Sequence, residues 1–413
     1  MFRRTASNSD DRSCNETSDR ASEDPFAFLV PNHSDDAHRT RLRSWLQLQA
    51  TLAFEPEHAI ACLRRTANPV DALKICGRSR VLSNAGLEIA ERQLAERGFG
   101  AMPITSPLYP APLAAISDAP PVLLVAGEPR QLSGQLVAIV GARAATVYGL
   151  SLAYALGARL AQVGVTVVSG LARGIDAAAH RGALEAGGQT IAVQACGPDR
   201  VYPAEHRGLA EQVKQNGALI TELPVGTPPR APNFPLRNRI ISGLCACIVV
   251  VEARERSGSL ITARHALDQG RDVMAFPGAV TSPTSLGPNR LIRDGAIPIL
   301  DVDDVIENLG IEVESSDVTA PQALDGNGMH RSARLPAAAS AAPELGKAGK
   351  MILESLDAGP VSRDELGRRV GIDPRQLDLD LMNLELHGRV VRDRDGRMTK
   401  VPLRTRSSRR GAK

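Results

Sequence analysis

The residues best suited to chemistry in this chain lie in two glycine-bearing turns, 141–143 and 169–176. Each turn follows a short β-branched apolar run and precedes a helix-like pattern, as phosphate-binding turns of doubly wound α/β sheets do. Glycine lets backbone N–H groups approach an anion, and the next helix adds its N-terminal amides and positive dipole end. Arg143 and Arg173 can add bidentate contacts to phosphate oxygens. We therefore expect one anion-binding ridge at the carboxyl edge of a sheet.

The expected anion contacts combine backbone amides with arginine side chains. They are Gly141, Ala142 and Arg143 in the first turn and Ser169, Gly170, Arg173, Gly174 and Ile175 in the second. A tight strand-to-helix turn without a ligand would use the same glycines, and the two interpretations are compatible. Arg143 also has a structural alternative, which is an ion pair with a carboxylate such as Glu222.

A further group of candidates lies at the start of a helix that we expect near residue 236. Arg237 and Arg239 can clamp phosphates or lock the loop to carboxylates such as Glu222, and both alternatives stay open. The two arginines lie about 200° apart around a helix, so each can do one of the two jobs. Two neighbours complete the set: Phe234, which stacks on a base or packs in the core, and Asn238.

Other polar residues near these turns are expected to hold loops in place. Asp176 lies four residues before His180, so the two side chains share one helix face. A metal site would need more ligands, and we expect an N-cap and an Asp–His hydrogen bond instead. Ser257 and Gly258 open a later helix and offer a further N-terminus for an anion, whereas a structural role is favoured for Thr262.

Strands and helices alternate from about 136 to 309, which indicates βαβ units and a mostly parallel sheet buried on both faces. The expected strands are 122–125, 136–140, 165–168, 190–193, 217–221, 247–251, 272–275 and 297–300. The expected helices are 148–162, 174–186, 204–215, 236–243, 258–269 and 303–309. The fold class is therefore α/β.

Composition divides the rest of the chain. The expected parts are 1–36, disordered; 37–100, a small helical domain; 101–310, the sheet domain; 311–346, a linker; 347–400, a last small domain; and 401–413, a basic tail. A helix-hairpin-helix that contacts a DNA backbone is the alternative for 37–100. Ala50–Phe54 stands where its glycine hairpin would be, so a helical packing module is favoured.

The last domain reads as three helices and a hairpin, which make a winged helix-turn-helix. Its third helix carries Asp378, Asp380 and Glu385 against the single cation Arg375. Carboxylates repel the phosphates of a DNA groove, so protein contact is favoured over base reading. The arginines of the wing remain available to a nucleic-acid backbone.

Length, net charge and composition limit the classes of protein that fit this sequence. The chain has 413 residues, a net charge of only +3 and 3% aromatic residues. Such a low aromatic content argues against binding of single strands mainly by stacking. The six cysteines form no C-x-x-C and no disulfide-like spacing, so we expect reduced thiols in a cytoplasmic protein. No apolar run approaches the ~18 residues of a membrane span, and no membrane insertion is expected.

Several motifs together resemble the DNA-processing protein DprA (Smf) family. They are SGLARGID (169–176) through His180, Tyr202-Pro203, NFPLRNRIISGL (233–244), VVEA (250–253), SGSLITA (257–263), FPG (276–278) and GPN (287–289). The similarity covers about 110–300 densely, and the C-terminal winged helix fits the same family. The resemblance implies an extended Rossmann-like domain that binds single-stranded DNA in a positively charged pocket, without catalytic turnover or cofactor. It also implies a homodimer that protects incoming strands in natural transformation and helps to load a RecA-type recombinase.

Two departures from the family pattern concern the phosphate contacts. The resemblance assigns a phosphate-contacting role to Arg143, but Ala142 stands where the family usually has serine, so a hydroxyl contact is lost. Many members carry a basic residue directly after the Tyr-Pro pair, where this chain has Ala204. Arg207, one helical turn further on, is the expected substitute.

An enzyme that handles nucleotides is the alternative function for the same sheet. The phosphoribohydrolases of this general architecture show a Pro-Gly-Gly-x-Gly-Thr turn, and this chain has FPGAV (276–280) at the corresponding place. The chain also has no Gly-x-x-x-x-Gly-Lys-[Ser/Thr] motif of a P-loop and no G-x-G-x-x-G after its first parallel strand. We therefore expect a binding protein and not an enzyme.

Overall fold

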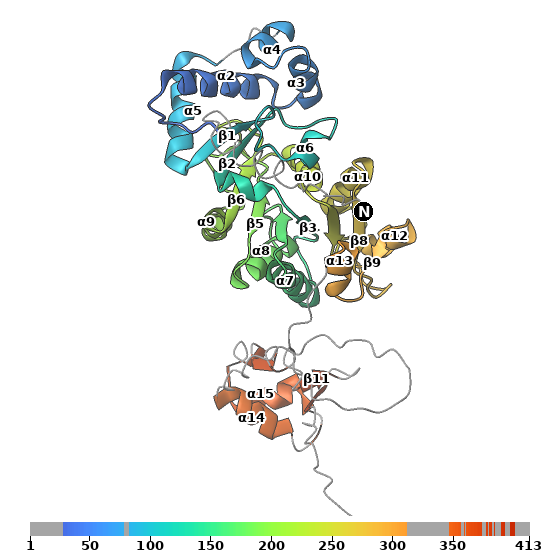
Figure 1. Ribbon diagram of the computed structural model, residues 1–413. Coiled ribbons are helices and arrows are strands. Elements are labelled where there is room, and N and C mark those ends of the chain that lie inside the picture. The colour runs from blue at the N-terminus through green and yellow to red at the C-terminus, as the bar shows by residue number, and fades with distance from the viewer. Residues whose placement is uncertain are drawn as a thin grey trace, which may run out of the picture. The chain divides into compact units, whose positions relative to one another are not determined.

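The computed structural model describes residues 28–77, 82–311 and, near the C-terminus, 347–356, 359, 361–373, 377–378, 380–381, 384, 390–392 and 397–400. The chain forms two compact units, with residues up to 320 in the first and the remainder in the second (Figure 1). The expected linker from 312 onward and the basic tail from 401 lie outside the described residues.

A nine-stranded sheet organises the described part of the first unit, in the order β1-β2-β6-β5-β4-β3-β7-β8-β9. Its strands are β1 (Phe99–Pro103), β2 (Val122–Gly127), β3 (Leu136–Val140), β4 (Thr166–Ser169), β5 (Thr190–Val193), β6 (Gly217–Thr221), β7 (Cys247–Val250), β8 (Asp272–Ala275) and β9 (Ile297–Pro298). The strands from β6 to β9 in this order are parallel, whereas β1 and β2 are antiparallel. The expected mostly parallel α/β sheet is confirmed.

Helices cover both faces of this sheet. They are α6 (Ala111–Ala114), α7 (Val147–Gln162), α8 (Ile175–Glu185), α9 (Arg207–Gln215), α10 (Asn233–Leu244), α11 (Gly258–Asp268), α12 (Leu286–Arg293) and α13 (Asp303–Asn308), with the 3-10 turns η1 (Pro129–Leu132) and η2 (Ala204–His206). Val137 and Ile139 of β3 pack with α7 and α8, whereas Ala138 and Val140 pack with the core on the other face. This alternation explains why the strands are continuously apolar.

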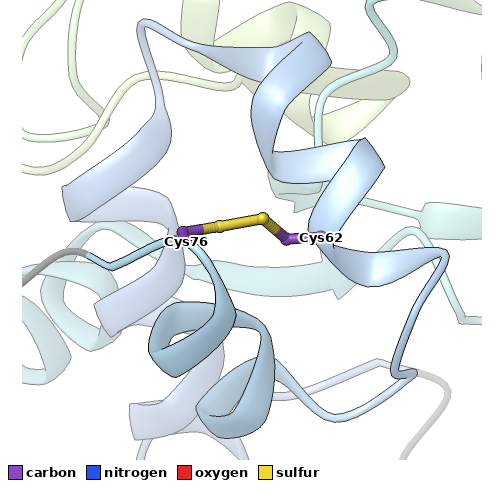
Figure 2. Close-up of a disulfide and its surroundings, with 2 residues drawn as sticks. All are labelled: Cys62 and Cys76. Carbon is purple, nitrogen blue, oxygen red and sulfur yellow. A yellow bond between two sulfur atoms is a disulfide. The ribbon is translucent and has the colours of Figure 1, made fainter.

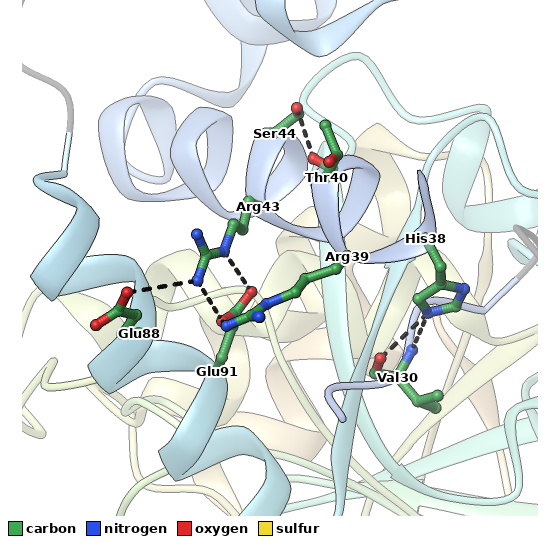
Figure 3. Close-up of polar contacts among 8 residues, drawn as sticks. All are labelled: Val30, His38, Arg39, Thr40, Arg43, Ser44, Glu88 and Glu91. Carbon is green, nitrogen blue, oxygen red and sulfur yellow. Dashed lines mark hydrogen bonds and ion pairs between the residues drawn. The ribbon is translucent and has the colours of Figure 1, made fainter. Parts of the chain in front are cut away.

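Four helices precede the parallel strands: α2 (Asp36–Leu52), α3 (Pro56–Leu63), α4 (Pro69–Ile75) and α5 (Asn84–Arg97). Their core, which includes the fully buried Trp45, is continuous with β1, β2 and the sheet. Figure 3 shows how α2 is tied to α5, where Arg43 donates to both carboxylate oxygens of Glu91 at 2.8 and 2.9 Å. The helical segment is thus part of the first unit and packs directly on its sheet.

The expectation of disorder up to residue 36 is wrong for its last residues, and residues 1–27 lie outside the described part. Leu29 is fully buried and forms a β-bridge with Ala101, with N···O distances of 2.9 and 2.7 Å. The ring of His38 lies within hydrogen-bond distance of the backbone of Val30 (Figure 3). Leu29, an apolar residue at the border of a polar stretch, thus joins this segment to β1, a strand that the sequence analysis also missed.

The expectation that all cysteines are reduced is wrong for one pair. Cys62 of α3 and Cys76, at the end of α4, form a disulfide (Figure 2). The two residues are 14 positions apart in sequence, a spacing that matches no motif, and only the packing of α3 on α4 brings them together. Cys196, Cys245 and Cys247 are free and buried, as expected for packing residues.

The second unit contains α14 (Lys347–Ser355), α15 (Arg363–Val370) and a three-stranded sheet of β10 (Val361–Ser362), β12 (Arg397–Lys400) and β11 (Val390–Arg392). The hairpin of β11 and β12 is the expected wing. In the expected third helix, Asp378 accepts two hydrogen bonds from Arg363 at 2.6 and 2.7 Å. One carboxylate of the expected third helix is therefore paired with an arginine of the same unit.

Among the described helices, none is both long enough and apolar enough to cross a bilayer.

Candidate functional site

A pocket of about 480 Å³ lies where the order of the strands reverses. From β3 the chain proceeds to one side through β4, β5 and β6, whereas β7 pairs with β3 on the other side. In open α/β sheets, ligands bind at such a switch point, outside the carboxyl ends of the strands. Residues 140–144 at the end of β3 and residues 254 and 256–259 after β7 line the pocket, and α10 closes it with Phe234, Arg237, Asn238 and Ile241.

Arg143 projects over the ring of Phe234, with 4.7 Å between its guanidinium carbon and the ring centroid. Tyr202 meets the same ring edge-on at a centroid distance of 5.7 Å and is itself 42% exposed. A cation on one side of a ring and an exposed aromatic beside it form a surface that suits both a phosphate and a base. Arg143 does not use its alternative partner Glu222, because that carboxylate is buried against Arg239.

The second glycine turn already binds a carboxylate of the protein itself, that of Asp176. Oδ2 of Asp176 accepts hydrogen bonds from the N–H groups of Gly170 and Ala172 at 3.1 and 3.4 Å. Burial raises the pKa of Asp176, while Arg237 and these backbone bonds oppose the rise. Ser169 donates its hydroxyl to the carbonyl of Ile139. Two amides and the serine hydroxyl of the turn after β4 therefore have partners within the protein, which favours the interpretation that the turn is structural.

The two glycine turns touch each other. The N–H of Ile175 donates to the carbonyl oxygen of Ala142 at 3.3 Å, so its amide also has a protein partner. Gly174 has a φ of 75°, and a side chain on it would collide with the carbonyl oxygens of Ala142 and Arg143. The turn after β4 thus supports the turn that carries Arg143, and glycine at 174 allows the close approach.

The expected hydrogen bond between Asp176 and His180 does not form. Nδ1 of His180 lies 2.7 Å from the hydroxyl of Thr190, and that hydroxyl donates to the carbonyl of Val167. Since the Thr190 hydrogen is used, His180 must carry its proton on Nδ1 and donate it. Burial lowers the pKa of His180 to about 3. His180 fixes α8 to β5, whereas Asp176 fixes the turn.

Arg237 and Arg239 both act as structural cations, and the alternative of loop fixation is the one that the geometry favours. Arg237 is buried and donates to the carbonyls of Gly170, at 2.7 Å, and of Val193, while burial lowers its pKa to about 10. Arg239 is 1% exposed and pairs with Glu222 and with Asp118, the latter at 3.2 Å. Arg237 still borders the pocket, whereas Arg239 faces away from it.

The start of α11 forms the other wall of the pocket. Ser257 caps the helix by accepting a hydrogen bond from the N–H of Ser259, so the capping role falls to Ser257. Asn238 donates to the carbonyl of Gly258 at 3.2 Å and positions this turn. Thr262 is buried at the pocket wall. One wall of the pocket therefore brings together four residues that the sequence analysis singled out: Asn238, Ser257, Gly258 and Thr262.

Two exposed arginines of the pocket were missed. Arg254 and Arg256 follow β7 and line the pocket together with Arg143 and Arg237. Their signal was present in the sequence, because Arg254 and Arg256 flank Glu255 between the apolar strand that ends at Val250 and the Ser-Gly-Ser turn. With Asp176 as the one carboxylate among the described residues that line the pocket, the lining is strongly cationic.

Six other predicted contacts lie outside the pocket lining: Ser169, Gly170, Gly174 and Ile175 of the turn after β4, together with Arg173 and Arg207. Arg173 is exposed and binds both carboxylate oxygens of Glu205, with Nη2 at 2.7 Å from Oε2. Arg207 is exposed at the start of α9 and is not among the lining residues. Neither side chain reaches the pocket in this conformation, although both sit on the same carboxyl edge of the sheet.

Comparisons with known proteins show the family of the chain. The model of the family DNA recombination-mediator protein A matches residues 101–310 of the 413. The chain belongs to the DprA (Smf) family. A DprA winged helix domain matches 336–396, which identifies the second unit as a winged helix.

Relatives from several bacteria match the chain. The chain is 47% identical to Protein Smf of Escherichia coli over 50% of this chain, but the match spans only 56% of that relative's length. It is 43% identical to the DNA processing protein DprA of Bacillus subtilis, with 52% of this chain and 72% of that protein covered.

Two solved structures of DprA proteins are similar to the chain. The crystal structure from Streptococcus pneumoniae has a TM-score of 0.53 at 33% identity, and the match covers 66% of this chain and 97% of that one. A structure from Helicobacter pylori, described as revealing a single-stranded DNA binding mode of its own DprA, has a TM-score of 0.46 at 29% identity; it covers 48% of this chain and 92% of that one. The DprA fold of the sheet unit follows from the first of these.

Proposed function

We propose that this DprA-family protein binds single-stranded DNA in the pocket at the switch point. The observation that carries the proposal is the combination of exposed Arg143, Arg254 and Arg256 with the ring of Phe234 around one opening. The arginines would contact successive phosphates, and Phe234 with Tyr202 would offer a face to a base. Such contacts are independent of sequence, since every nucleotide has a phosphate and an aromatic face.

We further propose the wider role that family membership implies. The protein would act in the cytoplasm as a homodimer, protect incoming strands during natural transformation and help to load a RecA-type recombinase. Exposed apolar side chains in the segments that follow β8 and β9 support self-association, since Val280 and Leu300 are each 81% exposed and Leu286 is 44% exposed. The winged helix would contact a protein partner.

The alternative of a nucleotide-handling enzyme finds little support in the pocket. Of the described residues that line it, Asp176 is the one carboxylate, and its oxygen is already bonded to two backbone amides. A general base needs to reach the proton that it removes. Arginine remains charged at neutral pH and cannot take this role. We therefore propose a binding function without catalysis.

Fluorescence anisotropy of a labelled oligo-dT, measured across a salt series, tests the proposal. We expect binding whose log affinity falls linearly with log salt. Arg143→Glu should weaken binding by more than tenfold and make the salt slope shallower by about 0.7 for each lost phosphate contact.

Arg130→Glu is the matched control, because it makes the same change of charge at the opposite edge of the sheet. Arg130 is exposed in η1, which follows β2, and the end of β2 lies beside the start of β6. This variant should keep the affinity within about twofold. If the folded protein does not bind oligo-dT even at low salt, the proposal fails, and a screen of nucleotides for hydrolysis would follow.

A further inference from the structure

Three metal-ligating side chains converge in the N-terminal helices, away from the pocket. His58 and Cys62 lie four residues apart on α3, so they share one face of the helix. Cys76 follows the last residue of α4, and its sulfur is bonded to that of Cys62 (Figure 2). The ligand atoms of His58, Cys62 and Cys76 all lie within 4.8 Å of one another. Among the described residues, this is the one group of three such ligands.

The three donors suit a soft, tetrahedral cation when the disulfide is reduced. Zn²⁺ binds thiolate at about 2.3 Å and imidazole at about 2.0 Å, so its ligands lie roughly 3.3–3.8 Å apart. Reduction lets the two sulfurs separate toward this spacing, and a short rotation brings the imidazole within reach. Two thiolates and an imidazole favour Zn²⁺ over Mg²⁺ or Ca²⁺. Water would take the fourth position, as in other sites with three protein ligands.

The position of the three residues gives both a reductant and a metal ion access to the site. Cys62 is buried, Cys76 is half-buried and His58 is exposed, so the cluster opens to solvent on the side of the imidazole. The helices do not depend on the disulfide for their packing. Ile60 and Leu63 of α3 and Ala72 and Leu73 of α4 belong to the core that also contains Trp45. The site should therefore survive reduction with its helices in place.

We propose that His58, Cys62 and Cys76 form a Zn²⁺ site in the dithiol state and exchange it for the disulfide in the oxidised state. A dithiol reductant transfers two electrons and two protons to the S–S bond and becomes a disulfide itself. Zn²⁺ then displaces the two thiol protons as two Zn–S bonds form. A disulfide oxidant reverses the sequence by thiol–disulfide exchange: it takes up two electrons and two protons from solvent and becomes a dithiol, while the Cys62–Cys76 bond re-forms and Zn²⁺ is released. This inference is independent of the function proposed for the pocket.

Cobalt provides a direct test on the full-length chain. One sample is left oxidised, and another is reduced with dithiothreitol and freed of it under argon; both are then titrated with Co²⁺. The reduced protein should develop the thiolate-to-metal charge-transfer bands and the intense d–d bands of tetrahedral cobalt, with one ion per chain. Added Zn²⁺ should abolish them. The oxidised protein should show neither, because a disulfide offers no thiolate.

Variants separate the proposed site from incidental binding. His58→Ala leaves the disulfide intact and should weaken Co²⁺ binding by the reduced protein by more than about tenfold, and Cys76→Ser should remove the thiolate bands. His33→Ala, another exposed histidine, and Cys196→Ser, a buried free thiol, serve as matched controls and should bind as the wild type does. The proposal is overturned if the reduced wild type shows no tetrahedral bands, or if Cys76→Ser retains them.

Discussion

Arg143 lies over the ring of Phe234, at 4.7 Å from its centroid, although one residue follows β3 and the other begins α10. The ring is half-buried and restrained by Tyr202, so it acts as a floor that limits where the guanidinium can point. A long side chain loses rotamer entropy when a ligand orders it. Because Phe234 already restrains Arg143 in the free protein, Arg143 has less of this entropy to lose on binding. The pair thus prepares Arg143 to meet a phosphate at the switch point.

The first prediction concerns this ring. Phe234→Leu removes the aromatic face for a base and the restraint on Arg143, so the affinity for oligo-dT should fall about tenfold or more, in line with the ~1–3 kcal/mol of one base–aromatic stack. Phe234→Tyr keeps the ring and should bind nearly as the wild type does. Anisotropy at a fixed salt concentration measures both. Equal affinities of the Phe234→Leu and Phe234→Tyr variants for oligo-dT would mean that the ring only fills space.

The second prediction uses two glycines that share a positive φ. Gly174 and Gly187 have φ values of 75° and 76°, but only Gly174 faces backbone oxygens, since nothing lies within 4 Å of a Cβ at Gly187. Gly187→Ala should cost about 1 kcal/mol, the strain of a left-handed residue. Gly174→Ala adds a collision with the turn that carries Arg143, so it should cost clearly more and also weaken DNA binding. Urea unfolding and anisotropy check the two effects, and similar unfolding losses would contradict the account.

The third prediction concerns pH. The folded state lowers the pKa of His180 from 6.5 to about 3, chiefly through burial, so between these values the unfolded chain binds more protons than the folded one. Stability from this group is present above pH 6.5 and is lost as the pH falls toward 3. Asn at 180 does not titrate, and its amide can still donate to Thr190. Urea unfolding at pH 7.5 and pH 5 should therefore show a smaller difference for His180→Asn than for the wild type; an unchanged difference would assign the pH dependence to other groups.

The fourth prediction concerns the exposed pair of Arg173 and Glu205. Glu205 engages Arg173 through both oxygens, so it withholds a cation from DNA at the edge of the site. Glu205→Gln should tighten oligo-dT binding by about two- to tenfold and steepen the salt slope, because Arg173 becomes available to phosphate. The double variant with Arg173→Gln should lose this gain. Unfolding should hardly change, since exposed ion pairs contribute about 0–1 kcal/mol. A gain that persists in the double variant would point to removal of the negative charge alone.

Much of the site was readable from local sequence. Apolar β-branched runs that end in glycine turns mark the carboxyl ends of buried parallel strands, and such ends share one edge of a sheet. For this reason Gly141, Arg143, Phe234, Ser257 and Gly258 could be placed at one edge before any fold was known, and they do line or border one pocket. The alternation of strands and helices determined the fold class in the same way.

The partners of charged side chains were decided by the tertiary structure. Asp176 and His180 share a helix face, yet the carboxylate turns to the amides of Gly170 and Ala172 while the imidazole reaches Thr190 on β5. Helical spacing predicts which side chains are neighbours, but a buried polar group takes whichever partner the packing brings within hydrogen-bond distance. Arg237 and Arg239 differ from the exposed arginines for the same reason. Both are buried, so they bind acceptors within the protein.

The sequence by itself therefore determined the class of fold, the edge of the sheet that carries the site and the family resemblance, because these depend on local periodicity and on short motifs. Only the tertiary structure decided that α3 and α4 bring Cys62 to Cys76 and that Leu29 pairs with Ala101 on β1. Contacts of this kind depend on how helices and strands pack across the chain. Packing is set by the shape of the whole core, which no local pattern of residues encodes.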